Sequence, residues 1–292
     1  MPPRRPATRP LAGLLLLALL LPSPGPRPAA AEPAAQRVVS LNPSLTQTLL
    51  ALGAGAALVG VDEYSAREEP AVRGLPRVGG LFDPSLEAVV ALEPDLVVLV
   101  PSAQQRDFRG RLEALGIPVL ALANISLAEV LDGVLALGER VGRGEAARVR
   151  VAEVRRAFAE LSRESAGRER ERAVLVLQRE PLFVVGRGSF LDAMLAAAGL
   201  ANAAAEFGEP YPRVSTEWLI AQAPELLLDA SEDPEPPTRY WARWPSLPAV
   251  ARGRVLALEA GAVTLPGPWL DRGLRRLAAA VAAEAPGAGP DL

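Results

Sequence analysis

The sequence predicts an α/β protein in which two Rossmann-like lobes are joined by one long, rigid interlobe helix. From residue 37 to residue 142, short apolar runs rich in Val and Leu alternate with amphipathic segments, and the alternation resumes after residue 167. This pattern is typical of parallel sheets covered by helices. Residues 145–167 carry no strand pattern but have an apolar stripe, which predicts a helix of about 20 residues and about 30 Å.

The first half of the chain contributes four strands and four helices to this prediction. Asn42 before Pro43 and Asp83 before Pro84 are typical helix starts, because the first side chain caps the helix and Pro is tolerated in its first turn. We expect a polar loop after the second strand. The expected strands are residues 37–41, 57–64, 95–100 and 117–122, and the expected helices are residues 42–53, 83–94, 104–115 and 126–142.

The second half repeats the alternation of strands and helices. The expected strands are residues 172–178, 182–186, 225–230 and 254–258, and the expected helices are residues 189–202, 214–224 and 266–285.

The N-terminus has the pattern of a secretory signal peptide. Arginines precede an apolar run at residues 11–21, and Ala29, Ala30 and Ala31 offer a small-residue cleavage site. The run is shorter than the roughly 20 residues that span a membrane. We therefore expect a soluble exported protein that is cleaved near Ala31. The predicted organisation is a signal peptide (1–31), an N-terminal lobe (32–143), an interlobe helix (144–167) and a C-terminal lobe (168–292).

The composition excludes several kinds of chemistry. The chain has no His and no Cys, which removes Ser-His-Asp catalysis, thiol catalysis and most zinc sites. Its basic residues are all Arg and are spread along the chain, so nucleic-acid binding has little support. We expect no cofactor and no metal site.

One local pattern occurs twice, about 130 residues apart. "FDPSLEAVVALEPDLVVLV" begins at Phe82, and "YPRVSTEWLIAQAPELLLDA" begins at Tyr211. In each, an acid (Glu87 or Glu217) lies just inside a helix start, and a Pro and a buried strand follow. Either acid alone is explained by the helix dipole, which stabilises such a carboxylate by about 0.3–1 kcal/mol. The repetition, one acid in each lobe, favours a shared function.

The chain resembles the periplasmic substrate-binding proteins of ABC importers for cobalamin, ferric siderophores and heme. The resemblance covers nearly all of the chain after the signal peptide. It rests on six segments in order, namely "RVVSLNPSLTQTLLALGAGAALVGVDEYS", "LEAVVALEPDLVV", "LGIPVLAL", "VVGRGSFLDAMLAAAGLAN", "YPRVSTEWLIAQAPELLL" and "LPGPWL".

This resemblance implies a monomer that binds its ligand in a cleft between two lobes. It also implies that one exposed glutamate from each lobe docks to the permease dimer of the importer, and Glu87 and Glu217 match those positions. A rigid connecting helix should restrict lobe closure to a few degrees.

The resemblance also suggests where the ligand is held. Cobalamin-binding relatives have a tyrosine that matches Tyr64 and aromatic residues near Phe183 and Tyr211, and Phe82 holds a place similar to that of Tyr211. For each of these aromatics, core packing is the alternative. The late loop that contacts the ligand in relatives matches Gly261, Ala262, Val263, Thr264 and Leu265, but here it lacks their aromatic and charged residues.

The residues leave the identity of the ligand open. Trp269 stands where the family often has an Arg, so a cation for an anionic siderophore or for heme is missing there. Arg187 either supplies such a cation in its place or is only part of a turn. Heme needs an axial ligand, for which Tyr64 and Tyr211 remain. A corrinoid is therefore the first choice, before ferric siderophores and heme. The aromatic cluster at residues 240–244 either packs against the sheet or faces the cleft.

An enzyme is the main alternative from another class of protein. "GRGSF" (residues 186–190) matches neither the hydrolase elbow G-x-S-x-G nor the dinucleotide fingerprint G-x-G-x-x-G. Paired carboxylate catalysis would require Glu87 and Glu217 to converge within about 10 Å, although they lie in different lobes. We therefore expect a binding protein and not an enzyme.

Overall fold

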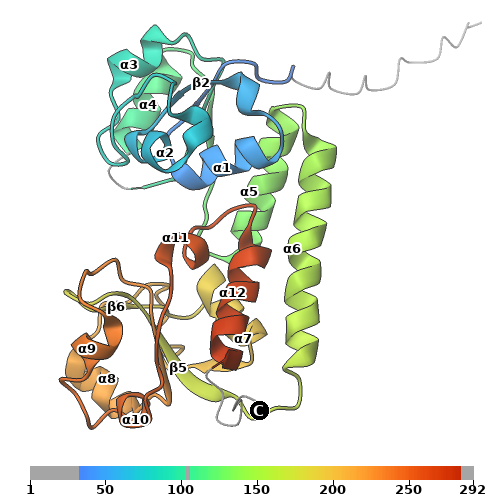
Figure 1. Ribbon diagram of the computed structural model, residues 1–292. Coiled ribbons are helices and arrows are strands. Elements are labelled where there is room, and N and C mark those ends of the chain that lie inside the picture. Colours follow the sequence, from blue (N-terminus) through green and yellow to red (C-terminus); the bar gives the residue numbers. More distant parts are fainter. Residues whose placement is uncertain (1–32, 103–105, 284–292) are drawn as a thin grey trace, which may run out of the picture. The chain divides into compact units, whose positions relative to one another are not determined.

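The computed structural model describes residues 33–102 and 106–283 (Figure 1). The signal peptide expected at residues 1–31 lies outside this range. In the described part of the chain, the first sheet is parallel, with the strand order β2-β1-β3-β4. Its strands are β1 (Val38–Ser40), β2 (Leu58–Val61), β3 (Leu96–Leu99) and β4 (Val119–Ala121). The sequence prediction of a parallel sheet is confirmed.

The helices of the first half follow the prediction with two differences. They are α1 (Pro43–Ala51), α2 (Glu63–Glu68), α3 (Leu86–Ala91), α4 (Arg106–Ala114) and α5 (Leu127–Arg140), with 3₁₀ turns η1 (Gly55–Ala57) and η2 (Pro70–Val72). Asn42 caps α1 as expected, since its side chain accepts a hydrogen bond from the amide of Ser44.

The first difference is that α2 replaces the predicted polar loop. The carboxylate of Asp62 accepts the amides of Tyr64 and Ser65 and so caps a helix of 6 residues. The second is the start of α3, which is capped by Ser85 and not by Asp83. The amide of Ser85 donates to the carbonyl of Val78, and this bond keeps the preceding residues in a turn, so the helix begins later than predicted.

The second sheet has the order β6-β5-β8-β9 in the described part of the chain, and β7 also pairs with β5. Its strands are β5 (Glu171–Gln178), β6 (Phe183–Val184), β7 (Leu200–Asn202), β8 (Leu226–Asp229) and β9 (Val255–Ala257). All pairings are parallel except that of β6 with β5. The sequence prediction missed β7, because its three residues continue the apolar pattern of the preceding helix.

The second sheet is covered by the remaining helices, which are α7 (Phe190–Ala197), α8 (Thr216–Gln222), α9 (Pro237–Trp241), α10 (Pro248–Ala251), α11 (Ala260–Val263) and α12 (Leu270–Ala283). Tyr240 and Trp241 are buried in the hydrophobic core between α9 and this sheet, and Trp244 packs against them. The aromatic cluster at residues 240–244 is therefore used for packing.

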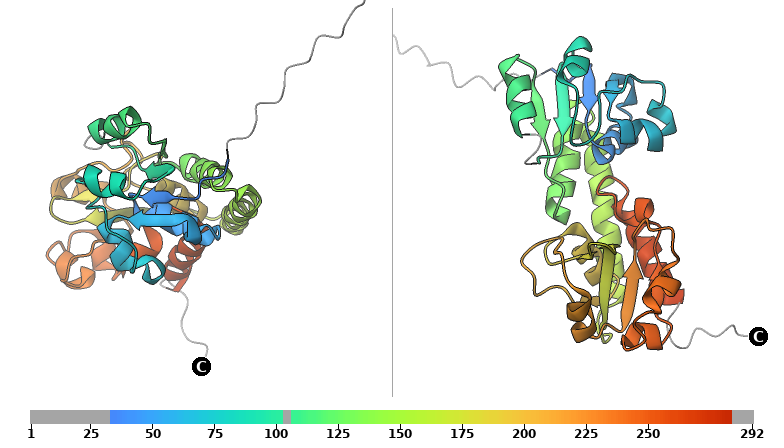
Figure 2. Two further views of the ribbon diagram at one scale, coloured as in Figure 1. Left: turned by 90° about the horizontal axis from the view of Figure 1, so that it is seen from above. Right: turned by 90° about the vertical axis from the view of Figure 1, so that its left-hand side faces the viewer.

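Two antiparallel helices lie between the last strand of the first sheet and the first strand of the second: α5 and the 21-residue α6 (Gly144–Glu164) (Figures 1 and 2). Val130 and Val134 of α5 share a core with α6, α7 and α12, whereas Leu137 of α5 belongs to the core of the first sheet. The predicted boundary between residues 143 and 144 falls in the turn between α5 and α6. No helix among the described residues is long and apolar enough to cross a bilayer.

The close packing of α5 on α6 depends on Gly138. A Cβ placed there would stand 2.4 Å from Cβ of Ala147 on α6, whereas a Cβ at Gly133 of the same helix would make ordinary contact, 3.7 Å from Cβ of Leu122. We predict that Gly138→Ala lowers the free energy of unfolding by about 1–3 kcal/mol through overpacking. The matched control Gly133→Ala should raise it by up to about 1 kcal/mol, because Ala favours helices. Urea unfolding measures both, and equal effects would contradict this packing.

Candidate ligand-binding site

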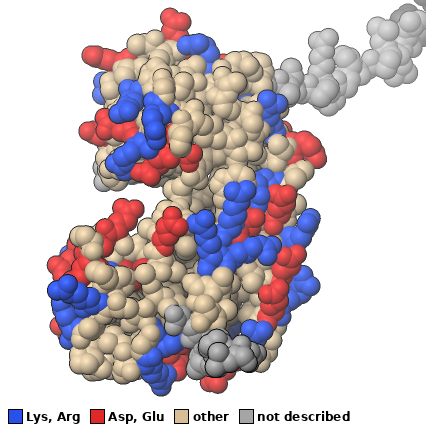
Figure 3. Space-filling view, viewed as in Figure 1, with Lys and Arg blue, Asp and Glu red and all other residues tan. Residues whose placement is uncertain are grey.

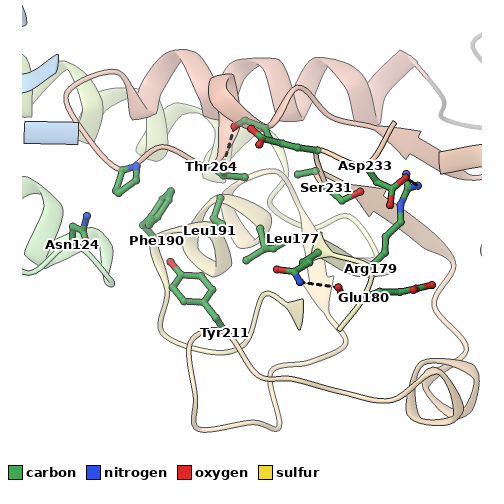
Figure 4. Close-up of a pocket in the computed structure, with 15 residues that line it drawn as sticks. Asn124, Leu177, Arg179, Glu180, Phe190, Leu191, Tyr211, Ser231, Asp233 and Thr264 are labelled. Carbon is green, nitrogen blue, oxygen red and sulfur yellow. Dashed lines mark hydrogen bonds and ion pairs between the residues drawn. The ribbon is translucent and has the colours of Figure 1, made fainter. Parts of the chain in front are cut away.

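A cavity of about 630 Å³ lies beyond the carboxyl ends of β5 and β8 (Figure 4). In open α/β sheets, ligands bind at this edge. Most of the lining residues follow the two strands or belong to α7 and the segment around α11, and Asn124 comes from the loop after β4. The lining residues are Asn124, Leu177, Gln178, Arg179, Glu180, Phe190, Leu191, Tyr211, Ala230, Ser231, Glu232, Asp233, Ala260, Thr264 and Pro266.

A buried ion pair holds one wall of the cavity. Nε of Arg179 donates to Oδ2 of Asp229 at 3.0 Å, and the two side chains are 1% and 0% exposed. The Asp229 carboxylate also accepts from Nε1 of Trp241 and from the amide and hydroxyl of Ser231. Arg179 in turn donates to the carbonyl of Glu235 at 2.6 Å. The pair therefore fixes both ends of the loop that contains Glu232 and Asp233.

Most hydrogen-bond donors of the lining are already used within the protein. The hydroxyl of Ser231 donates to Asp229, and that of Thr264 donates to the carbonyl of Ala260. The amide nitrogen of Gln178 donates to the carbonyl of Glu180. Nη2 of Arg179 is a buried donor without a hydrogen-bond partner, but the carboxylates of Glu180, Glu232 and Asp233 are acceptors only, so the lining suits a ligand that brings N–H or O–H donors.

The lining also carries more negative than positive charge. The one arginine among its described residues, Arg179, is paired with Asp229 and lies 3.3 Å from a carboxylate oxygen of Asp233. The carboxylates of Glu180 and Glu232 belong to exposed residues. Figure 3 shows acidic side chains beside the hollow on this face of the molecule. Free anionic groups of a ligand would therefore be repelled here.

Tyr211 stands in the cavity wall and packs against the core of the second lobe. Burial raises the pKa of its phenol to about 12, so at neutral pH the side chain is uncharged and offers a hydroxyl donor. The same burial disfavours the phenolate form of Tyr211, which is the form that would bind iron.

The cavity contains two of the predicted ligand-binding residues, Tyr211 and Thr264. Gly261, Ala262 and Leu265 are near it in sequence but do not line it, and Val263 is buried in the core. Because residues 260–263 form α11, the predicted late loop is a short helix that turns only part of itself to the cavity.

The three other predicted aromatics lie outside the cavity lining. Phe183 is half-buried in β6, Phe82 is 68% exposed, and Tyr64 is 41% exposed beneath the guanidinium of Arg67. Arg67 in turn interacts electrostatically with Glu232 of the cavity lining, so α2 faces the cavity's acidic loop.

Arg187 and Trp269 both lie outside the cavity lining, so Arg187 does not supply the cation that is missing at position 269. Arg187 donates to the carbonyls of Ala205 and Glu206. Trp269 packs between the guanidinium groups of Arg150 and Arg272. Arg179, Glu180 and the loop from Ser231 to Asp233 line the cavity but were not among the predicted ligand-binding residues. They directly follow predicted strands, so the rule that ligands bind at strand ends was the signal that pointed to them.

Glu87 and Glu217 occupy equivalent positions in the two lobes. Each is the second residue of its helix, after a serine cap at Ser85 or Ser215, and each is exposed. A hydrogen bond from the Ser215 side chain lowers the pKa of Glu217. An exposed apolar residue stands one turn further along each helix, Val90 or Ile220.

The equivalence extends to the end of each helix. Glu93 and Ala223 both have a left-handed backbone, with φ of 45°, and a Pro follows each. An arginine at the start of the central strand, Arg37 or Arg172, donates to carbonyls at this helix end. The repeated sequence therefore specifies a repeated structure from the helix cap to the strand.

The comparisons with known proteins identify the family. The sequence matches the periplasmic binding protein family over residues 38–261. The chain belongs to this family, as the resemblance predicted. The vitamin B12-binding protein of Salmonella paratyphi A (strain ATCC 9150 / SARB42) is 31% identical over 219 residues, which are 74% of this chain and 81% of that protein.

Two solved structures agree with the fold. The periplasmic vitamin B12-binding protein of Vibrio cholerae is 25% identical, with a TM-score of 0.73 over 86% of this chain and 98% of that chain. The periplasmic heme-binding protein of Roseiflexus sp. RS-1 in its apo form is 26% identical, with a TM-score of 0.72 over 87% of this chain and 100% of that chain. The predicted α/β fold class is confirmed, and the matched relatives are binding proteins and not enzymes.

Removing the arginine of the buried pair should be costly. We predict that Arg179→Met lowers the free energy of unfolding by about 3–5 kcal/mol, because Asp229 becomes a buried charge without a counterion. The double variant Arg179→Met, Asp229→Asn should recover part of the lost free energy of unfolding, because it also removes the buried charge. The matched control Arg239→Met removes an arginine whose side chain is 82% exposed and should change stability by less than about 0.5 kcal/mol. Urea unfolding of the three variants tests this, and a small loss for Arg179→Met would contradict the role of the pair.

The shifted pKa of Tyr211 predicts a specific pH dependence. Its folded-state pKa of about 12 exceeds the ordinary value of about 10. Below pH 10 the phenol is neutral in both states; as pH rises from 10 to 12 the unfolded chain ionises first and folded stability falls. We expect Tyr211→Phe to remove about 1 kcal/mol of this alkaline loss at pH 11. Urea unfolding at pH 8 and pH 11 measures the difference, and parallel losses in wild type and variant would contradict it.

Proposed function

We propose that the protein captures a corrinoid, such as cobalamin, in this cavity in the periplasm and delivers it to an ABC importer. The observation that carries the proposal is the lining itself, which has an excess of acceptors and negative charge. A corrinoid bears several primary amides, whose N–H groups meet these acceptors, and it presents no carboxylates to the cavity. The names of the similar vitamin B12-binding proteins support the same ligand.

Heme and ferric siderophores are the alternative ligands of the same family. Heme brings carboxylates and the catecholate and carboxylate siderophores bring anionic oxygens, and the one arginine of the described lining is already paired with Asp229. Heme also requires an axial ligand. Tyr211 is a neutral phenol with a raised pKa, and Tyr64 lies outside the cavity lining. These features favour the corrinoid over heme and over anionic siderophores.

A corrinoid is larger than the cavity, so part of it must lie outside. Tyr64 and Phe82 offer exposed aromatic surface for that part, because aromatic rings suit large, flat apolar faces. The loop that carries Phe82 is tied to α2, since the amide of Glu63 donates to the carbonyl of Gly79. In this proposal Tyr64, Phe82 and Phe183 contact the parts of the ligand that the cavity does not enclose.

We also propose that Glu87 and Glu217 dock to the two permease subunits. The support is the equivalence of their surroundings, because a partner built from two like subunits is matched by two like surfaces. Each surface combines one exposed carboxylate with an exposed apolar residue, Val90 or Ile220. The packed pair α5 and α6 limits the movement of one lobe against the other, so delivery proceeds with only a small closure.

Titration calorimetry with cyanocobalamin tests the proposed ligand. Protein purified from the periplasm should bind one equivalent with Kd below ~1 µM, and hemin and a ferric siderophore should bind at least ~100-fold more weakly. Tyr211→Ala should weaken cyanocobalamin binding by ~10-fold or more through loss of cavity wall, whereas the exposed control Leu115→Ala should not. Saturation by hemin but not by cyanocobalamin would reject the corrinoid.

Uptake of labelled cyanocobalamin by cells tests the docking role. The double variant Glu87→Ala, Glu217→Ala should abolish transport and leave ligand affinity intact. The matched control Asp107→Ala, Glu145→Ala also removes two acids from first helical turns, but outside the repeated surfaces, and should transport normally. Normal uptake by the first variant would refute docking through these glutamates.

A further inference from the structure

We propose that the acidic lining selects among corrinoids by charge and favours cobinamides, which lack the anionic nucleotide loop, over complete cobalamins. This inference rests on the proposed function and adds a specificity to it, with Glu180 and Glu232 as the residues that determine it. Cyanocobalamin is neutral because its phosphodiester balances the charge of the cobalt–corrin centre. Aquocyanocobinamide has no phosphodiester and carries one positive charge.

The described lining of the cavity carries a net negative charge. Among the described lining residues there are three carboxylates, Glu180, Glu232 and Asp233, and one guanidinium. The guanidinium of Arg179 is balanced by Asp229, which is fully buried behind the lining. Three negative charges of the lining therefore act on a bound ligand, and no positive charge of the lining offsets them.

The groups next to Glu180 and Glu232 do not neutralise these two carboxylates. Glu180 accepts a hydrogen bond from the hydroxyl of Tyr240, which is a neutral donor. Glu232 interacts electrostatically with Arg67, but that guanidinium forms its ion pair with Glu68 at 2.9 Å. The Arg67–Glu68 pair has no net charge, so the potential at the opening of the cavity stays negative.

Coordination of cobalt by an imidazole or a thiolate does not offer another explanation of such a preference. The chain has no His and no Cys, and Met194 is fully buried in the core. A cobinamide that exchanges its axial water therefore meets no imidazole or thiolate here. Its gain over cyanocobalamin has to come from charge and hydrogen bonding.

The expected size of the effect follows from electrostatics. Partly exposed charges several ångströms away, at an effective dielectric constant between those of protein and water, together change the affinity for one added charge by about tenfold. Salt weakens this effect, because the screening length falls from about 30 Å at 0.01 M to about 8 Å at 0.15 M.

The test is titration calorimetry with cyanocobalamin and aquocyanocobinamide at about 0.01 M and 0.15 M NaCl. Three proteins are compared, namely the wild type, Glu180→Gln with Glu232→Gln, and the charge-matched control Asp107→Asn with Glu145→Gln. A cobalamin monocarboxylic acid, in which one amide is a carboxylate, serves as the anionic probe.

We expect the wild type to bind cobinamide about tenfold more tightly than cyanocobalamin at low salt, and the monocarboxylic acid more weakly. The preference should shrink at higher salt. It should fall toward one in the Glu180→Gln, Glu232→Gln variant and persist in the control.

A preference that survives both glutamate substitutions, or equal affinities for the two corrinoids in the wild type, would overturn this inference and leave the proposed function standing. Failure of both corrinoids to bind the wild type would overturn the proposed function and this inference with it.

Discussion

The binding site depends on the buried ion pair between Arg179 and Asp229. The pair joins the ends of β5 and β8 and, through Ser231 and Glu235, fixes the loop that lines the cavity. It also determines the chemistry of the lining, because it removes the only arginine of the described lining from the reach of an anionic ligand. A buried pair of this kind adds little net stability and costs several kcal/mol when one partner is lost. Its role here is to hold a loop in one conformation and to leave the cavity negative.

The repeated surfaces illustrate how a sequence pattern specifies local structure in two places. Ser85 and Ser215 cap the helices, Glu93 and Ala223 end them in the left-handed conformation, and the following Pro prevents continuation. An arginine donates to carbonyls at each helix end. Each acid is thereby presented on the exposed face of a short helix with a fixed start and end, which suits the proposed docking to a two-fold partner.

Much of the fold was predictable from the sequence, because buried strands and capped helices leave local patterns. The helix α2 was missed because its start depends on one side chain, Asp62, in a polar segment, and β7 was missed because a three-residue strand has no periodicity. The site was less predictable. Tyr211 and Thr264 were named from family resemblance, whereas the pairing of Arg179 with Asp229 joins residues that are 50 positions apart and depends on strand order, which no local pattern encodes.

The structure of the protein with cyanocobalamin bound would show whether this negatively charged cavity holds the ligand. We expect Arg179 to remain paired with Asp229, and amide nitrogens of the ligand to lie about 3 Å from carboxylate oxygens of Glu180 or Glu232. A complex in which Arg179 leaves Asp229 to bind the ligand, or in which the ligand lies away from this cavity, would contradict this expectation.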